Sequence, residues 1–190
     1  ALCAQDNMTV AYPSTPASYF HLLRWQALQP HVKPLIILTP KSLLRSKLAA
    51  SAAADFTSGE FKPVIDDASV TKANVKRVVF SSGKVYYNIL TERETRNITD
   101  IALVRVERLY PLPAPEIAAL LSHYPDDVEL VWAQEEPANQ GSWPFVGLEF
   151  PAQLNRGIRP VTRPAASSPA VGSHKLHDIE QANLVNQALS

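Results

Sequence analysis

The feature that most constrains what this chain can fold into is a regular alternation of two kinds of segment over residues 75–190. Short apolar runs, typical of buried strands, alternate with segments whose apolar side chains recur three to four residues apart, as on one face of a helix. The predicted strands are residues 75–81, 101–106, 128–133 and 158–162, and the predicted helices are residues 83–96, 114–124, 142–155 and 173–188. This order predicts an α/β fold with a mostly parallel sheet and right-handed crossovers.

Residues 1–45 predict a smaller β-α-β piece. Residues 8–12 and 34–38 are strand-like, and a helix begins at Thr15 and Pro16. Thr15 can accept a capping hydrogen bond, and Pro16 suits the first helical position because its missing N–H would be unpaired there anyway. Two strands alone have marginal stability. We therefore expect this piece to be the end of a domain that begins upstream, with the boundary between residues 45 and 46.

Composition argues against several classes of protein. The 190 residues are 46% hydrophobic and 19% charged, with a formal net charge of zero. Nothing therefore attracts nucleic acid or an anionic membrane, and no apolar run reaches the roughly 20 residues of a membrane span. The single cysteine, Cys3, excludes an internal disulfide and indicates a reducing compartment. His174 and His177 could share one helix face, but no third zinc ligand lies nearby, so we expect no metal site.

One stretch, residues 128–143, turns from apolar to polar within a few positions. The apolar run is followed by amides, carboxylates and a proline: Gln134, Glu135, Glu136, Pro137, Asn139, Gln140 and Gly141. An open α/β sheet presents its binding edge where its strands end. Two adjacent carboxylates and two amides exceed what a helix cap needs. The stretch therefore indicates either a strand end with a helix cap or a contact with a ligand or subunit.

Two other polar motifs leave alternatives open. Residues 81–84, Ser-Ser-Gly-Lys, lie between a predicted strand and helix, which indicates a tight turn with a solvated lysine or a weak anion contact. The spacing of a phosphate-binding loop is absent. Arg105 and Glu107 alternate onto one strand face and Arg108 onto the other, which indicates a salt-linked strand edge or an anion contact.

Taken together, six segments are more specific than any single motif. In order they are NMTVAYPSTPASYFHLLRWQAL, KPLIILTPKSLLR, VKRVVFSSGKVYY, DIALVRVERLYPLP, VWAQEEPANQGSW and RPAASSPAVGSHKLH. They resemble the carboxy-terminal part of the thiamine-diphosphate-dependent first component of 2-oxoglutarate dehydrogenase. The sequences of these segments are most similar to those of the actinobacterial branch, in which one chain can also carry an acyltransferase domain. The resemblance covers nearly all of the chain.

The resemblance implies an enzyme whose full-length chain decarboxylates 2-oxoglutarate on thiamine diphosphate and Mg²⁺ in the tricarboxylic acid cycle. A succinyl group then passes to a lipoyl arm of the acyltransferase component. The enzyme would be a homodimer in the bacterial cytoplasm. An enzyme of the 2-oxoadipate type and a purely structural or regulatory domain are the alternatives.

The resemblance also implies what each part of this chain does. Residues 1–45 would end a pyrimidine-binding domain, and residues 46–190 would form the transketolase-like carboxy-terminal domain. The family's cofactor ligands and catalytic histidines lie upstream of Ala1. We therefore expect no catalytic, cofactor-binding or metal-binding residue in this segment, no activity in isolation, and a role in assembly and allosteric control.

Two sets of residues carry the remaining expectations. The actinobacterial branch binds acetyl-CoA as an activator in an arginine-rich pocket between the two domains. Thr9 matches that pocket, Arg24 lies beside an altered position, and Arg108 is a new cation. Most other pocket positions lack the expected basic or hydroxyl groups: Trp25, Glu60, Pro63, Pro115 and Glu116. We therefore expect weak acetyl-CoA binding. The residues expected to support a dimer or domain interface are Gln134, Glu135, Glu136, Asn139, Gln140 and Trp143.

Overall fold

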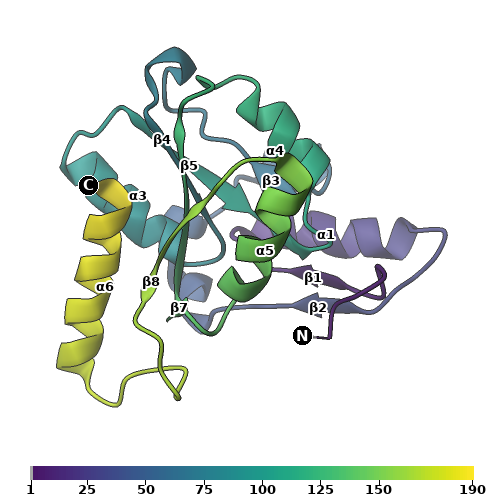
Figure 1. Ribbon diagram of the computed structural model, residues 1–190. Coiled ribbons are helices and arrows are strands. Elements are labelled where there is room, and N and C mark those ends of the chain that lie inside the picture. Colours follow the sequence, from purple (N-terminus) through teal and green to yellow (C-terminus); the bar gives the residue numbers. More distant parts are fainter. Residues whose placement is uncertain (1) are drawn as a thin grey trace.

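A five-stranded sheet forms the centre of the larger part of the chain (Figure 1). The computed structural model describes residues 2–190. The strand order is β3-β5-β4-β7-β8, and all neighbours are parallel except β3, which is antiparallel at the edge. The strands are β3 (Val64–Ile65), β4 (Arg77–Ser81), β5 (Ile101–Val106), β7 (Glu129–Pro137) and β8 (Arg159–Arg163). The predicted α/β fold with a mostly parallel sheet is confirmed.

Helices cover both faces of this sheet. They are α3 (Val85–Thr95), α4 (Ala114–Leu121), α5 (Trp143–Leu154) and α6 (His174–Leu189). Successive strand side chains point to opposite faces, so Phe80 and Trp132 pack in the core under α4 and α5. Val79 and Val131 pack in the other core, under α3 and α6. Because both faces are buried, the strands can be continuously apolar, which is why the sequence marks them clearly.

The first residues form a second, smaller sheet with the order β2-β1-β6. Its elements are β1 (Thr9–Ala11), α1 (Pro16–Leu28), β2 (Leu35–Ile37) and β6 (Arg108–Tyr110). β1 and β2 are parallel, whereas β6 comes from the later part of the chain and is antiparallel to β1. As expected, Thr15 caps α1 by accepting a hydrogen bond from the Ser18 N–H. The β-α-β piece is therefore extended by a strand that the sequence analysis did not predict.

Short helical segments lie in the connections, three of them between β2 and β3 and one between β3 and β4. They are η1 (Lys41–Arg45), η2 (Lys47–Ala49), α2 (Ala53–Thr57) and η3 (Lys72–Asn74). Among residues 2–190, no helix is long and apolar enough to cross a membrane.

The main difference from the sequence-based expectation lies in β7. The expected strand ended at Ala133, but the observed strand continues to Pro137. β8 runs beside this extension, with an irregular register after Ala133 and a pairing of Pro137 with Arg163. The polar stretch thus begins inside the strand, because Gln134 finds partners within the turn that follows.

Candidate functional site

Gln134 organises the turn between β7 and α5. Its buried side-chain oxygen accepts hydrogen bonds from the indole N–H of Trp132 at 3.1 Å and from the backbone N–H of Trp143 at 2.7 Å. Its amide nitrogen donates to the carbonyl groups of Gln140 at 2.8 Å and Pro137 at 3.3 Å. The Gln134 amide therefore ties the strand end to the start of α5 and is fully occupied by this chain's own groups.

Asn139 and Gln140 connect the same turn to the segment after β8. Asn139 donates to the carbonyl of Ala166 and accepts from its N–H, both at 3.0 Å. Gln140 donates to the carbonyl groups of Ala166 at 2.9 Å and Ser168 at 3.3 Å. The two amides thus stabilise an exposed loop against the turn.

The two carboxylates of the stretch have different surroundings. Glu135 forms an ion pair with Lys84 at 3.1 Å, whereas Glu136 has no ion-pair partner among the residues that the structure describes. Burial, with a contribution from both carboxylates, raises the pKa of the Tyr12 hydroxyl to about 12. Tyr12 follows β1, so these carboxylates lie where the smaller sheet meets the larger one.

The turn at residues 81–84 is tight, as one interpretation of the sequence predicted. Its lysine, Lys84, is not a free solvated side chain, because it forms an ion pair with Glu135. Gly83 has a positive φ of 67°, and the Tyr12 ring lies directly against it. The hydroxyl of Ser82 donates to the carbonyl of Val106. These contacts favour the structural interpretation of the motif.

A buried carboxylate joins the two parts of the chain. Glu107 lies between β5 and β6 and is 1% exposed. It accepts hydrogen bonds from the Ser14 N–H at 2.8 Å, the Ser14 hydroxyl at 2.5 Å and the Ser18 hydroxyl at 2.6 Å. Arg105 donates to the Ser14 hydroxyl at 3.0 Å, and Tyr87 donates to the Ser14 carbonyl at 2.8 Å. Ser14 is therefore the centre of the junction.

Burial raises the pKa of the Glu107 carboxyl above its usual value, although hydrogen bonds from Ser14 and Ser18 and the nearby Arg105 oppose the shift. Of the three charged residues for which a salt-linked strand edge was one interpretation, Arg108 pairs with Glu116, whereas Arg105 and Glu107 form no direct ion pair. The two side chains meet through the Ser14 hydroxyl, and Arg105 stacks over the ring of Tyr86 at 4.8 Å. A serine that lies 91 residues away from Arg105 gives no local signal of this contact.

The candidate effector residues are only partly brought together. Thr9, Trp25 and Arg108 line a cavity of about 210 Å³ between the two parts, but Arg24 is exposed and does not line it. Arg108 donates to the carbonyl of Pro111 at 3.1 Å and to Glu116 at 3.4 Å. The one arginine in this cavity is therefore already engaged by a carboxylate.

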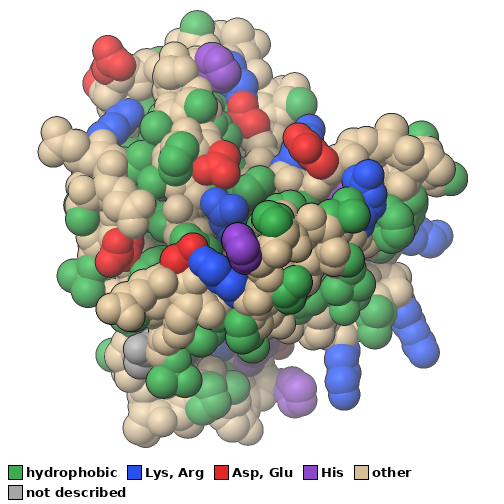
Figure 2. Space-filling view, turned by 90° about the vertical axis from the view of Figure 1, so that its right-hand side faces the viewer, with side chains coloured by type: hydrophobic (Ala, Val, Ile, Leu, Met, Phe, Trp, Pro, Cys, Tyr) green, Lys and Arg blue, Asp and Glu red, His purple; other side chains and the backbone are tan. Residues whose placement is uncertain are grey.

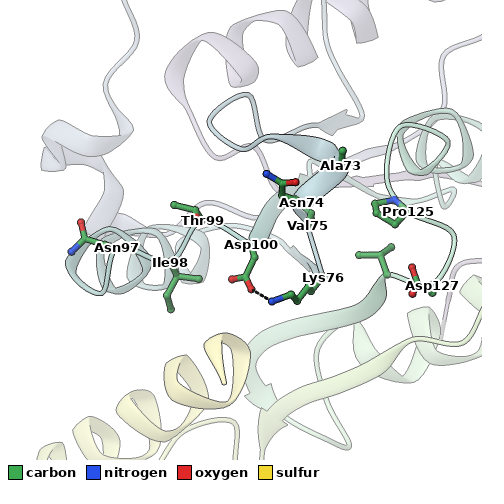
Figure 3. Close-up of a pocket in the computed structure, with 11 residues that line it drawn as sticks. Ala73, Asn74, Val75, Lys76, Asn97, Ile98, Thr99, Asp100, Pro125 and Asp127 are labelled. Carbon is green, nitrogen blue, oxygen red and sulfur yellow. Dashed lines mark hydrogen bonds and ion pairs between the residues drawn. The ribbon is translucent and has the colours of Figure 1, made fainter.

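A wider hollow of about 850 Å³ lies at the amino-terminal ends of the parallel strands, at the end of the sheet opposite to the Gln134 turn. Figure 3 shows its charged groups: Lys76 and Asp100 point toward each other, 3.0 Å apart, and Asp127 lies across the hollow. Lys76, the one Lys, Arg or His in the lining among residues 2–190, is thus paired within the chain. This edge lacks the carboxyl ends of strands at which α/β sheets bind ligands.

His174 and His177, the two histidines of α6, do not belong to a metal site among residues 2–190. His177 accepts a hydrogen bond at Nδ1 from Arg163 at 3.2 Å, and Arg163 also donates to Gln181 at 2.8 Å. Within residues 2–190, no group of three or more His, Cys, Asp or Glu side chains could hold a metal ion.

A second buried network was missed by the sequence analysis. Asp67 and Arg93 form an ion pair in which both side chains are buried. Asp67 also accepts hydrogen bonds from the Ser69 hydroxyl at 2.5 Å and the Leu103 N–H at 2.9 Å, while Arg93 donates to the Ile101 carbonyl at 3.0 Å. Both residues lie in polar segments, so nothing local marked them as buried.

Two family models match this chain in succession. The model described as "Transketolase, pyrimidine binding domain" matches residues 1–47, and the model described as "2-oxoglutarate dehydrogenase C-terminal" matches residues 50–189.

Curated proteins resemble the whole chain. A "Multifunctional 2-oxoglutarate metabolism enzyme" of Mycobacterium sp. strain KMS is 43% identical over 100% of this chain and 16% of its own length. The "2-oxoglutarate dehydrogenase E1/E2 component" of Corynebacterium glutamicum is 47% identical over 98% of this chain and 16% of its own. The "2-oxoglutarate dehydrogenase E1 component" of Cupriavidus necator is 45% identical over 100% and 20%. The chain thus spans a fifth or less of these relatives' length.

Proposed function

The chain belongs to the 2-oxoglutarate dehydrogenase C-terminal family, and we propose that it is a carboxy-terminal part of the first component of a thiamine-diphosphate-dependent 2-oxoglutarate dehydrogenase. The full-length chain would decarboxylate 2-oxoglutarate and pass succinyl to the lipoyl arm of an acyltransferase component, in the bacterial cytoplasm. The observation that carries this proposal is the match of both family models, in order, to residues 1–47 and 50–189.

The proposal places the cofactors outside this segment. Thiamine diphosphate would supply the electron sink that stabilises the carbanion, and Mg²⁺ would hold its diphosphate. Among residues 2–190, no group of three or more His, Cys, Asp or Glu side chains could hold a metal ion. We therefore assign no catalytic step to this segment and expect it to be inactive alone.

Titration with thiamine diphosphate and Mg²⁺ tests this assignment. Calorimetry on the full-length enzyme should show saturable binding, and the enzyme should release CO₂ from 2-oxoglutarate faster than from 2-oxoadipate. Residues 1–190 alone should show neither binding nor CO₂ release. Tight Mg²⁺-dependent binding by the segment would contradict the placement of the ligands, and a preference for 2-oxoadipate would change the substrate.

The segment's own role would be structural, at the junction of two domains. We assign residues 1–45 to the end of the pyrimidine-binding domain and residues 46–190 to the transketolase-like carboxy-terminal domain. Two contacts support the role: β6 pairs with β1, and Glu107 binds both Ser14 and Ser18. These contacts would hold the carboxy-terminal domain in a fixed position relative to the cofactor-binding parts.

The residues after Ala133 would support this junction or the homodimer, not the chemistry. Glu135 and Glu136 lie beside Tyr12 of the first part, and Glu135 binds Lys84. Gln134, Asn139, Gln140 and Trp143 would fix the shape of the turn that carries the two carboxylates.

Replacing both carboxylates, Glu135→Gln with Glu136→Gln, tests this role in the full-length enzyme. We expect a lower thermal stability or a weaker dimer, with little change in KM for 2-oxoglutarate. The matched control replaces two adjacent acids just before β7, at the amino-terminal ends of the strands: Asp126→Asn with Asp127→Asn. A large loss of turnover with an intact, equally stable dimer would show that the carboxylates serve the reaction.

An acyl-CoA effector is the remaining proposal for Thr9, Arg24 and Arg108. The cavity that contains Thr9 and Arg108 lies between the two parts of the chain, as an allosteric site at a domain junction would. The carboxylate of Glu116 beside Arg108 would weaken binding of a polyanion there.

A further inference from the structure

At one point along the carboxyl ends of the strands of the five-stranded sheet, the connections that follow two neighbouring strands diverge and leave a gap. β4 is followed by α3, which leads to β5 on one side, whereas β7 is followed by α5, which leads to β8 on the other side. β4 and β7 are neighbours in the sheet. The connections that follow them therefore diverge from adjacent strand ends, in opposite directions and over opposite faces of the sheet. In open α/β sheets such a switch point is where ligands bind, in the crevice outside the strand ends.

A cavity of about 550 Å³ occupies this point. Ser82, which follows β4, lines it together with Trp132 and Glu136 of β7. The smaller sheet closes it from the other side through Val10, Tyr12 and Tyr110. The two parts of the chain thus enclose a volume that is within the usual range for small-molecule sites.

Most of the cavity wall is apolar and aromatic. The rings of Tyr110 and Phe145 pack edge to face, with their centroids 5.7 Å apart, and both line the cavity. Leu148, which is 74% exposed, lies at its rim. An aromatic or apolar ligand body would bury this surface and would find rings to pack against.

The charge of the wall is negative. Among residues 2–190, Glu136 is the one carboxylate in the lining, no Lys, Arg or His lines the cavity, and Glu136 has no ion-pair partner. Lys84, which lies two residues after Ser82, is engaged by Glu135. The side-chain amide of Gln134 is fully occupied by its own hydrogen bonds. Glu136 is therefore the group left to meet a charged ligand.

From this geometry we propose that the cavity is a binding site for a small molecule with an aromatic body and an ammonium group. The ring packs against Tyr110 and Phe145, and the ammonium group binds the Glu136 carboxylate. A charge-assisted hydrogen bond in a partly desolvated site is stronger than a neutral one and selects the sign of the ligand's charge.

Two probes with the same ring, similar size and opposite charge test the proposal: phenethylamine and 3-phenylpropionate, titrated calorimetrically into the full-length enzyme. We expect phenethylamine to bind at least tenfold more tightly than 3-phenylpropionate. Glu136→Gln should remove this difference by weakening phenethylamine binding at least tenfold. Glu149→Gln, which removes a half-buried carboxylate of α5 outside the cavity lining, should leave both affinities unchanged.

Several results would overturn the proposal. They are the absence of phenethylamine binding at millimolar concentration, equal affinity for the two probes, and a preference that survives Glu136→Gln. Equal weakening by Glu136→Gln and Glu149→Gln would show a general effect of surface charge. Circular dichroism and thermal unfolding of each variant establish that the fold is intact before affinities are compared.

Discussion

At the scale of single residues, Glu107 shows how one buried carboxylate joins two parts of a chain. Three donors from Ser14 and Ser18 meet it, yet burial still raises its pKa. A carboxyl whose pKa is higher in the folded state stabilises the fold below its unfolded-state pKa. That contribution is lost as the pH rises through the folded-state pKa. The junction should therefore be strongest when Glu107 is protonated.

Glu107→Gln keeps the shape of the protonated acid and removes its titration. We expect the stability difference between wild type and Glu107→Gln to fall as the pH rises above the usual pKa of a glutamate. At low pH the substitution should cost about 1 kcal/mol, the value of an ordinary hydrogen bond. Chemical unfolding of the full-length chain at several pH values measures this difference. If the difference grows with pH, the three donors outweigh burial and our sign is wrong.

The pair of Asp67 and Arg93 gives a prediction of the opposite sign. Burial opposes ionisation of Asp67, but hydrogen bonds from Ser69 and Leu103 and the charge of Arg93 lower its pKa. Its contribution is thus present above the unfolded-state pKa and is lost as the pH falls through the folded-state pKa. Asp67→Asn should cost roughly 3–5 kcal/mol at neutral pH, because it leaves a buried arginine unpaired.

An exposed ion pair provides the control for Asp67→Asn. Asp100 pairs with Lys76 at 3.0 Å on the surface. Asp100→Asn should cost roughly 1 kcal/mol or less, since exposed pairs contribute little. Thermal unfolding of both variants compares the two costs directly. Similar losses for Asp67→Asn and Asp100→Asn would contradict the difference that burial predicts.

Residue roles were the least predictable from the sequence. Arg105 and Glu107 were identified as a charged motif, but their common partner, Ser14, lies about 90 positions earlier. Asp67 and Arg93 were not identified at all. Sequence patterns report the local period of apolar residues, and hydrogen bonds between distant segments leave no such period.

At the scale of secondary-structure elements, most helices and strands were predictable. Buried strands of a parallel sheet are continuously apolar, so β4, β5 and β7 were found. Two features were not found: β6, which pairs with a strand about 100 residues earlier, and the polar end of β7. Both depend on a neighbouring strand, because three or four polar or mixed residues do not specify a strand by themselves.

The turn between β4 and α3 contacts the first part of the chain directly, through Gly83 and the ring of Tyr12. Gly83 has a φ of 67°, and a Cβ at this position would lie 2.2 Å from the Tyr12 ring. Gly83→Ala therefore combines backbone strain with a clash and should cost about 2 kcal/mol or more. Gly157→Ala, whose Cβ would meet no atom within 4 Å, should cost less than about 0.5 kcal/mol. Thermal unfolding of both variants checks this, and equal costs would show that Tyr12 moves away freely.

At the scale of the whole molecule, exposed apolar surface is concentrated in the first part of the chain. Most of the large exposed apolar side chains of residues 2–190 lie between residues 2 and 48, including Phe20 and Leu23 of α1 and Ile36 of β2. Figure 2 shows hydrophobic side chains on the face to the right of Figure 1, where α1 and the smaller sheet lie. Such a surface is typical of an interface, which agrees with our proposal that a larger domain includes this piece.

The same junction determines how strongly an acyl-CoA effector could bind. CoA carries several phosphate charges, and each needs charge-assisted donors. In the cavity beside Thr9, Arg108 is engaged by Glu116, and Lys33 is engaged by Asp6. Burial also lowers the pKa of Arg108, although Glu116 and Asp6 oppose this shift. Few free donors therefore remain for a polyanion.

We expect acetyl-CoA to bind the full-length enzyme at least tenfold more weakly than it binds a relative with an arginine-rich pocket. A deficit of about 1.4 kcal/mol is sufficient, and one lost charge-assisted hydrogen bond supplies roughly 1.5–3 kcal/mol. Glu116→Gln should release Arg108 and tighten binding, whereas the control Glu149→Gln should not. Calorimetry with acetyl-CoA measures all three proteins. Micromolar affinity of the wild type with clear activation, or no gain from Glu116→Gln, would show that the effector does not use this cavity.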